Sequence, residues 1–248
     1  LLDDLDGGDW TSSADFNVLI GNAGSMGQVE IGVGSRWHAI NSYILDGAST
    51  VSINGGTLEI GSGANPRDFD AEAMLDSYET GTLIVWGDLL GDYTLNAGAE
   101  LITDHVAGTV TLEGGIVRPG HSPGASTFGR LDVDALLLGT LEMEIWGDDP
   151  GVTYDTLEVV GDLTLDGTLL IVLGNYSPSL GQEFDLFDWT WISDAADGEF
   201  AQIVFSHDGY AGTLDYPTGV LTITDVPEPA SLCLLALGGL AIIRRRKK

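Results

Sequence analysis

Short runs of alternating apolar and polar residues recur along most of this chain of 248 residues. In the run VSINGGTLEIG, Val51 and Ile53 fall on one face of an extended chain, and Leu58 and Ile60 do so again after a glycine pair. A period of two on each side of two glycines is typical of a strand, a turn and a second strand. Similar runs continue at 93–102, 129–147 and 154–189, so we expect an all-β body.

One of these runs repeats farther along the chain. TVSINGGTLEIG at 50–61 aligns without a gap with TVTLEGGIVRPG at 109–120, so that Thr50 corresponds to Thr109 and Leu58 to Val117. The two copies are 109 − 50 = 59 residues apart. Three coils of about 20 residues would give this spacing, and a coil of that length lies within the range of solenoid repeats. Because one such strand cannot bury its inner face alone, stacking on neighbouring repeats is the natural solution. We therefore predict a parallel β-solenoid over residues 16–225, with glycines at its corners.

Two segments depart from the alternation. Residues 1–15 are acidic and rich in turn-forming residues, which indicates an irregular lead-in. Residues 65–81 contain helix-forming residues and lack alternation, so we expect a helix or loop inserted into a coil and projecting from it. Asp68 or Asp70 could cap such a helix, and its apolar side would include Met74, Leu75 and Tyr78.

The charge is very uneven along the chain. There are 38 acidic and 9 basic residues, and five of the basic residues are the last five of the chain. Residues 1–243 contain 38 acidic residues and only four arginines. This negative charge repels phosphate groups, which excludes nucleic acid as a partner. The surface can instead attract divalent cations or basic polymers. The single cysteine lies in the tail, so the body has no disulfide and no thiolate chemistry.

The tail has three parts. Its 14 apolar residues would span about 21 Å as a helix, against about 30 Å of bilayer hydrocarbon, and could just cross if the flanking side chains reach the interfaces. The predicted membrane helix consists of Ala230, Ser231, Leu232, Cys233, Leu234, Leu235, Ala236, Leu237, Gly238, Gly239, Leu240, Ala241, Ile242 and Ile243. The basic end stays in the cytoplasm as an anchor, formed by Arg244, Arg245, Arg246, Lys247 and Lys248. A simple tail anchor would also fit this run.

The residues before the apolar run narrow the interpretation of the tail from a general membrane anchor to a particular kind of signal. Pro227, Glu228 and Pro229 are followed by the apolar run and then by the basic end. This order resembles the PEP-CTERM sorting signal of exopolysaccharide-producing Gram-negative bacteria. The resemblance implies that residues 226–248 hold an exported protein in the inner membrane until an exosortase processes the signal. The resemblance further implies that the protein then moves to the cell surface or the medium. Because the chain begins with Leu1, we expect any signal peptide to lie upstream.

The second half of the body carries a further resemblance. Its elements are a PGxSPG turn, a strand pair containing LDGTL, the run GQEFDLFDW and a final TGVLTI strand, at 119–124, 154–169, 181–189 and 218–223. They resemble the C-terminal repeats of many PEP-CTERM proteins, which are related to autotransporter-type repeats. This resemblance covers about residues 109–248. It implies a β-solenoid that ends in a β-rich cap, and it implies no enzyme activity.

Several motifs with possible chemistry have structural explanations. GHSPG at 120–124 fits the nucleophile-elbow spacing, but Pro123 follows Ser122 and the chain leads into another strand, so we interpret it as a turn. The four histidines, which are His38, His105, His121 and His207, have no metal-ligand spacing. The acidic start contains Asp3, Asp4, Asp6 and Asp9. An EF-hand loop that begins at Asp4 would need an oxygen ligand at its fifth position and glycine at its sixth, but these positions hold Gly8 and Asp9.

Two further groups bear on a polysaccharide-related function. Carboxylates occur at i, i+2 spacing or side by side at Asp132/Asp134, Glu142/Glu144 and Asp148/Asp149, and alternation places them outward while Leu141 and Met143 point inward. Trp189 and Trp191 could form a platform for sugar stacking, or pack in the cap.

We predict no catalytic residue, metal site or cofactor. We expect an exported, non-enzymatic structural protein of the cell surface or matrix. The alternative is a β-helix that binds or degrades exopolysaccharide and carries the same signal.

Overall fold

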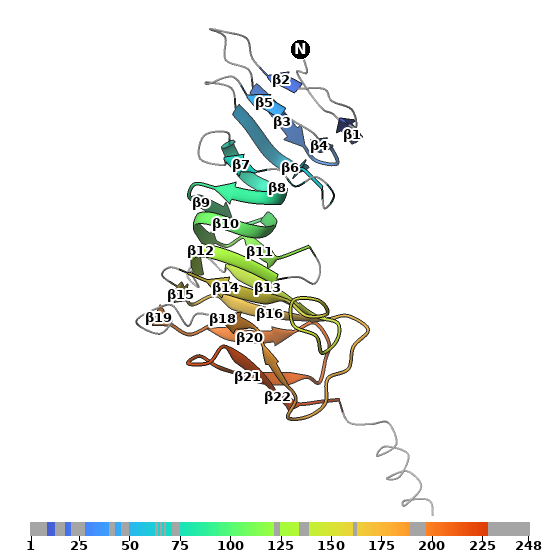
Figure 1. Ribbon diagram of the computed structural model, residues 1–248, viewed down its shortest axis with the longest axis vertical. Helices are drawn as coiled ribbons and strands as arrows, with labels where there is room; N and C mark the ends of the chain where they lie inside the picture. The colour runs from blue at the N-terminus through green and yellow to red at the C-terminus, as the bar shows by residue number, and fades with distance from the viewer. Residues whose placement is uncertain are drawn as a thin grey trace, which may run out of the picture.

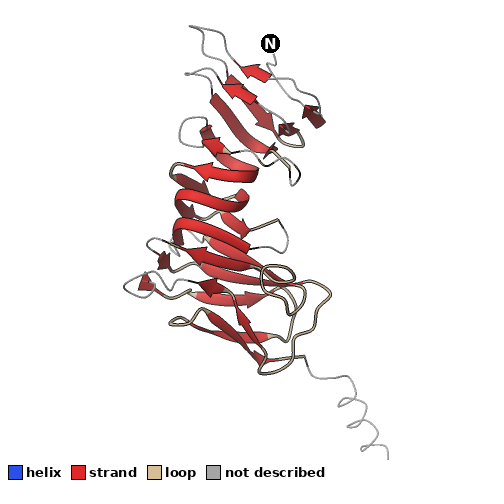
Figure 2. Cartoon of the chain, in the orientation of Figure 1, coloured by secondary structure: helices blue, strands red, loops and turns tan. Residues whose placement is uncertain are grey.

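A computed structural model of the chain describes residues 9–12, 18–20, 28–39, 43–45, 50–62, 64, 66, 68–70, 75–121, 125–133, 139–160, 163–188 and 197–227. Within these residues the protein is all-β and contains no helix (Figure 2). The strands follow one another along the long axis of the molecule (Figure 1). The strands are β1 (Asp9–Ser12), β2 (Val18–Ile20), β3 (Gln28–Gly32), β4 (Arg36–Ala39), β5 (Tyr43–Leu45), β6 (Thr50–Ile60), β7 (Phe69–Asp70), β8 (Leu75–Leu90), β9 (Tyr93–Asn96), β10 (Ala99–Glu113), β11 (Ile116–Pro119), β12 (Ala125–Val133), β13 (Thr140–Ile145), β14 (Thr156–Val159), β15 (Leu163–Leu165), β16 (Thr168–Leu173), β17 (Glu183–Asp185), β18 (Phe187–Asp188), β19 (Asp197–Gly198), β20 (Gln202–Phe205), β21 (Ala211–Asp215) and β22 (Val220–Asp225).

The described strands form both parallel and antiparallel pairs. Seventeen of them form one sheet whose pairs are parallel, β2 and β5 form a separate parallel pair, and β17, β22 and β21 form a three-stranded antiparallel sheet. In the large sheet, β4, β6, β8, β10, β11, β13, β16 and β20 follow β1 in one continuous parallel ladder, which we call the main ladder. Long strands such as β8 and β10 bend and take part in more than one ladder.

The main ladder explains the repeat seen in the sequence. Leu58 pairs with Leu83, Leu83 with Leu101, and Leu101 with Val117. Three steps of this ladder therefore join Leu58 to Val117, which are the two residues that the repeat aligns. The steps are uneven, because the first covers more of the chain than the second, and the second more than the third. The repeat length expected from the sequence thus holds as an average of these three steps and not for each one.

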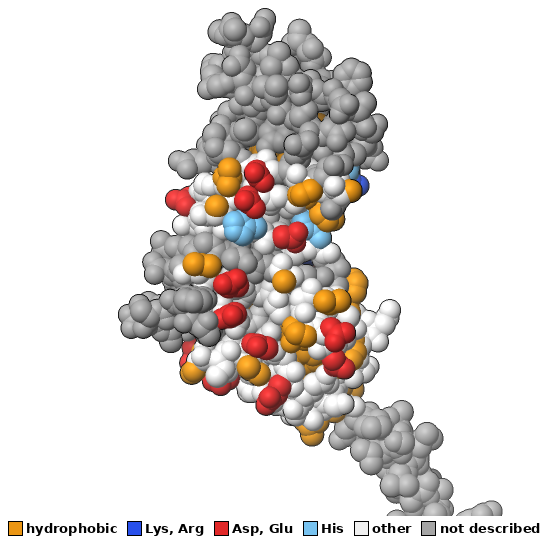
Figure 3. All heavy atoms as spheres, viewed as in Figure 1, with side chains coloured by type: hydrophobic (Ala, Val, Ile, Leu, Met, Phe, Trp, Pro, Cys, Tyr) orange, Lys and Arg blue, Asp and Glu red, His pale blue; other side chains and the backbone are white. Residues whose placement is uncertain are grey.

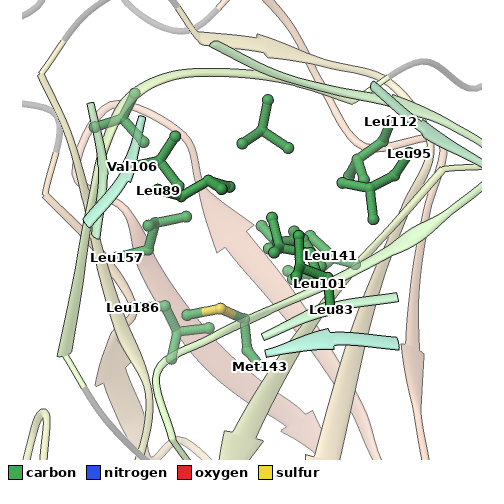
Figure 4. Close-up of a cluster of buried hydrophobic side chains, with 14 of the residues drawn as sticks. Leu83, Leu89, Leu95, Leu101, Val106, Leu112, Leu141, Met143, Leu157 and Leu186 are labelled. Atoms are coloured by element: carbon green, nitrogen blue, oxygen red, sulfur yellow. The ribbon is translucent and has the colours of Figure 1, made fainter. Parts of the chain in front are cut away.

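The inner face of the main ladder is apolar. One side chain from each of its strands from β6 to β16 points inward and is fully buried, and these residues are Leu58, Leu83, Leu101, Val117, Leu141 and Leu169. Leu89 and Val106, farther along β8 and β10, and Leu157 on β14 enter the same space (Figure 4). Each buried leucine contributes roughly 1.5–3 kcal/mol relative to an exposed one. This shared core requires the strands to be stacked, because a single strand leaves its apolar side chains in water.

Glycines occur where the strands bend. Gly55 has φ +81°, a conformation that costs little only for glycine, and it lies inside β6 where the register shifts. The turn predicted between two strands at this point is therefore wrong, since the strand continues through a bend. At the next residue, a Cβ atom on Gly56 would lie 2.5 Å from Cγ2 of Ile31. Successive strands approach each other too closely at the bend for any side chain.

Two other expectations are corrected. The helix or loop expected over 65–81 is wrong for Phe69–Asp70, which form β7, and from Leu75 on, where β8 begins, while Pro66 and Asp68 lie outside the strands. Phe69 is only 1% exposed, so β7 contributes a side chain to the core. The irregular lead-in is wrong at Asp9–Ser12, which pairs with β4. In both segments pairing with a neighbouring strand overrides the local preference of the residues.

The antiparallel sheet lies at the C-terminal end of the described body (Figure 1). Phe184 and Leu221 on β17 and β22 are buried in the same cluster as the leucines of the main ladder. β22 is the central strand of this sheet, held by β17 on one side and β21 on the other. The chain therefore leaves the body from a strand that is paired along both edges.

Candidate functional site

The C-terminal tail leaves the body immediately after β22. The backbone N–H of Val226 donates to Oδ1 of Asp225 over 2.9 Å, and the side chain of Val226 packs against the core. Pro227 is exposed and lies beside Gly209, where a Cβ atom would be 3.2 Å from Cγ of Pro227. The body thus holds the chain up to the first residue of the predicted Pro-Glu-Pro motif.

The rest of the predicted signal lies outside the described residues. This applies to Glu228, Pro229, the apolar run Ala230–Ile243 and the basic end Arg244–Lys248. The membrane helix therefore stays a prediction from the sequence. In the part of the chain that the structure describes, no helix has the length and apolar character needed to cross a bilayer.

A cluster of charged side chains lies on the outer face of the main ladder, centred on Glu59. Arg36 forms an ion pair with Glu59, and Nε1 of Trp86 donates to its Oε1 over 2.9 Å. Burial alone would raise the pKa of Glu59, but the hydrogen bonds from Arg36 and Trp86 outweigh it and hold the pKa below its usual value. The nearby charges of His38 and Arg36 act in the same direction. Glu59 is therefore a carboxylate held in the ionised form.

A second ion-pair group lies farther along the same face. Arg118 forms an ion pair with Glu100, and its Nε donates to Oε1 of Glu142 over 2.8 Å. Glu142 is 7% exposed, so it is buried although it was expected to point freely outward. Thr82 also donates to Glu100 over 3.0 Å. These side chains come from successive strands of the ladder, so their interactions join one strand to the next.

Two histidines pair with aspartates from other strands. Nδ1 of His121 lies 3.0 Å from Oδ1 of Asp104, and the ring of His121 stacks on Trp86 with 3.5 Å between ring centroids. Nδ1 of His105 lies 3.1 Å from Oδ1 of Asp88, although Asp104 is its neighbour in sequence. Alternation explains this, since adjacent residues of a strand point to opposite faces. The sequence carries no signal for either pair.

A cavity of about 290 Å³ opens near the C-terminal sheet. Its lining includes three carboxylates, which are Glu158, Asp185 and Asp188, together with Ala125, Pro150, Thr156 and Leu157. Burial raises the pKa of Asp185, and repulsion from Asp188 raises it further. Sequence reasoning missed this group because Glu158 on β14 is distant in the chain from Asp185 and Asp188 on β17 and β18. Within the described ranges, no group of three His, Cys, Asp or Glu side chains is arranged to hold a metal ion.

Two of the carboxylate pairs noted in the sequence, Glu142/Glu144 and Asp148/Asp149, do not line this cavity, and Asp134 lies outside the described residues. Leu141 and Met143 are fully buried as predicted, while Asp148 is exposed and accepts a hydrogen bond from Gln182 over 2.6 Å. The GHSPG segment follows β11 and precedes β12, so a strand stands where a nucleophile elbow needs a helix. Ser122, Trp189 and Trp191 lie outside the described residues, as do the acidic residues before Asp9.

The comparisons with known proteins concern the tail. Residues 225–247 match the PEP-CTERM protein-sorting motif. The comparison with curated proteins finds no match, and neither does the comparison with solved structures. A PEP-CTERM motif implies export with a membrane-anchored sorting signal at the C-terminus, and signals of this kind are recognised by exosortases. The matched range includes all three residues of Pro227–Pro229.

Proposed function

We propose that this protein is an exported structural component of the cell surface or extracellular matrix, delivered through an exosortase. The observation that carries the proposal is the sorting motif at 225–247, which begins where the last strand of the body ends. We further propose that the body is a parallel β-solenoid with a β-rich cap, related to autotransporter-type repeats. The continuous main ladder and its apolar interior support that architecture.

The outer face of the main ladder favours a structural role over an enzymatic one. Its described ion pairs, such as those of Arg36 with Glu59 and Arg118 with Glu100, connect successive strands. Their charges are therefore engaged in holding the stack together. Acidic side chains are spread over the visible face of the described body (Figure 3). A dispersed negative charge keeps a protein soluble and suits a position in a hydrated matrix.

One observation favours the alternative, a protein that binds or degrades exopolysaccharide. The cavity is lined by Glu158, Asp185 and Asp188, and the pKa of Asp185 is raised, as in polysaccharide-cleaving sites that hold one carboxyl group protonated. Its described lining contains no aromatic ring for a sugar to stack on, which weakens this alternative.

Incubation of the mature protein with a panel of exopolysaccharides tests the two functions, with binding and product release scored separately. The structural proposal expects no released product. Release that is lost in Asp185→Asn, while the variant keeps the wild-type melting temperature or a higher one, would establish the alternative. Binding without release, abolished by the same substitution, would establish a polysaccharide-binding role instead.

A further inference from the structure

We propose that, while the tail is intact, the C-terminal end of the body docks against the outer face of the exosortase. This end, which we call the tail-proximal surface, consists of Ser179–Gln182, Ser206–Tyr210 and Asp225. The inference rests on the proposed sorting function and adds a contact beyond the Pro-Glu-Pro motif. It concerns the folded body, whereas the motif itself belongs to the tail.

The first argument is the way in which the chain leaves the body. β22 pairs with β17 over Val220–Thr222 and with β21 up to Asp225, which is the partner of Ala211. Val226 packs against the core, and Pro227 lies against Gly209. No spacer separates the folded body from the sorting motif. Any enzyme that binds the motif must therefore come within contact distance of the residues around this exit.

The second argument is the reach of the chain. Only three residue steps separate Pro227 from Ala230, where the apolar run begins. A fully extended chain spans at most about 3.6 Å per residue, so these steps cover roughly 11 Å. The headgroup layer on one side of a bilayer takes up about 5–8 Å of this distance. The tail-proximal surface is thus held within a few ångströms of the membrane surface and of any enzyme embedded there.

The third argument concerns which partner this surface fits. His207, Asp208 and Asp225 are exposed, and the described residues of the surface include no lysine or arginine. The N–H of Gly181 donates to the carbonyl of Ile223 over 2.8 Å, which places the neighbouring Leu180 beside the last strand. Leu180 is 65% exposed. Anionic lipid headgroups repel these two aspartates, whereas a protein surface with polar or basic groups around an apolar contact accommodates them.

Photo-crosslinking in a host with a catalytically inactive exosortase tests this contact. A photoreactive residue replaces Leu180 or Asp208 in the full chain, and the matched control carries it at Val33. Val33 is 81% exposed and lies in the turn between β3 and β4, at the opposite end of the described body from β22 (Figure 1). We expect adducts with the exosortase from positions 180 and 208 and none from position 33. Inserting ten Gly and Ser residues after Val226 should lower the adduct yield about tenfold, because a long flexible linker dilutes the body near the enzyme.

Processing in a host with the active enzyme separates this inference from the sorting proposal. Removal of the tail without exosortase adducts from positions 180 and 208 would refute the docking surface and leave the sorting proposal intact. Adducts with lipid alone, or equal exosortase adducts from position 33, would refute it as well. A retained tail without adducts would contradict both proposals.

Discussion

Trp86 donates its indole N–H to Oε1 of Glu59 over 2.9 Å, which connects β8 to β6 on the outer face of the main ladder. The same carboxylate accepts a hydrogen bond from Arg36 on β4. Three successive strands are thus joined by one buried side chain. The apolar interior holds these strands from the inside, and this polar contact holds them from the outside.

Replacing Glu59 with Gln should destabilise the fold at neutral pH by about 1–2 kcal/mol, because it weakens hydrogen bonds to a charged group. The pKa of Glu59 is lowered in the folded state, so its contribution is present above the unfolded pKa of about 4.5 and is lost as the pH falls through the folded pKa. The difference in free energy of unfolding between wild type and Glu59→Gln should therefore shrink below pH 4.5. Urea denaturation at several pH values measures it.

Glu113→Gln is the matched control for this experiment, because Glu113 is an exposed glutamate on β10, which pairs with β8 and not with β6. It should change the free energy of unfolding by less than about 0.5 kcal/mol. Equal effects of the two substitutions at pH 7 would show that the Glu59 cluster does not stabilise the ladder.

Arg118→Met should be more harmful than Arg118→Lys. Met leaves Glu142 buried without a positive charge beside it, which lowers the free energy of unfolding by about 2–3 kcal/mol. Lys keeps the positive charge but lacks the planar guanidinium group that binds two carboxylates at once. In the double variant with Glu142→Gln, the loss should be smaller than the sum of the two single losses. A double-mutant cycle from chemical denaturation measures this coupling. Strict additivity would mean that the pair is not coupled in solution.

Gly115→Ala tests the close approach of strands at the bends. A Cβ atom at Gly115 would lie 2.5 Å from Cβ of Leu95, so the variant should lose about 1–3 kcal/mol by overpacking. Gly32→Ala is the matched control, since no atom lies within 4 Å of a Cβ atom there. Thermal melting of both variants compares them. An equal loss at the two positions would contradict the predicted crowding at the bend.

Asp185→Asn should stabilise the protein increasingly as the pH rises. The pKa of Asp185 is raised by burial and by repulsion from Asp188, so the stability that the protonated form provides is lost as the pH rises through the folded pKa. Asn cannot ionise and keeps a constant contribution. The melting temperature of the variant relative to wild type should therefore be higher at pH 7 than at pH 3.5. A difference that does not depend on pH would show that folding does not raise the pKa of Asp185.

The sequence predicts the interior of this body better than its surface. The alignment of Leu58 with Val117 could be found because an inner face repeats its apolar residues at each step of the ladder. The sequence alone predicts a helix near Leu75, because the local residues favour one. The segment forms a strand because β8 pairs with β6, and that pairing cannot be read from the sequence.

The site residues depend on the register between strands. Asp104 meets His121, and not its neighbour His105, because of how the strands stack. The cavity around Asp185 likewise depends on the distance between three strands. Neither arrangement leaves a pattern in the chain. The tail differs, since Pro227–Pro229, the apolar run and the basic end are contiguous and can be recognised directly.

The intact mass of the protein recovered from the cell surface or medium tests the sorting account most directly, in a host that carries the exosortase. Replacing Pro227–Pro229 with alanines should block processing and leave membrane insertion unchanged, while neutral residues in place of Arg244–Lys248 should weaken retention in the inner membrane. The account predicts that the mature wild-type protein lacks the apolar run and the basic end. A full-length chain that still ends in Lys248 at the cell surface would contradict it and would show that the tail is an ordinary membrane anchor.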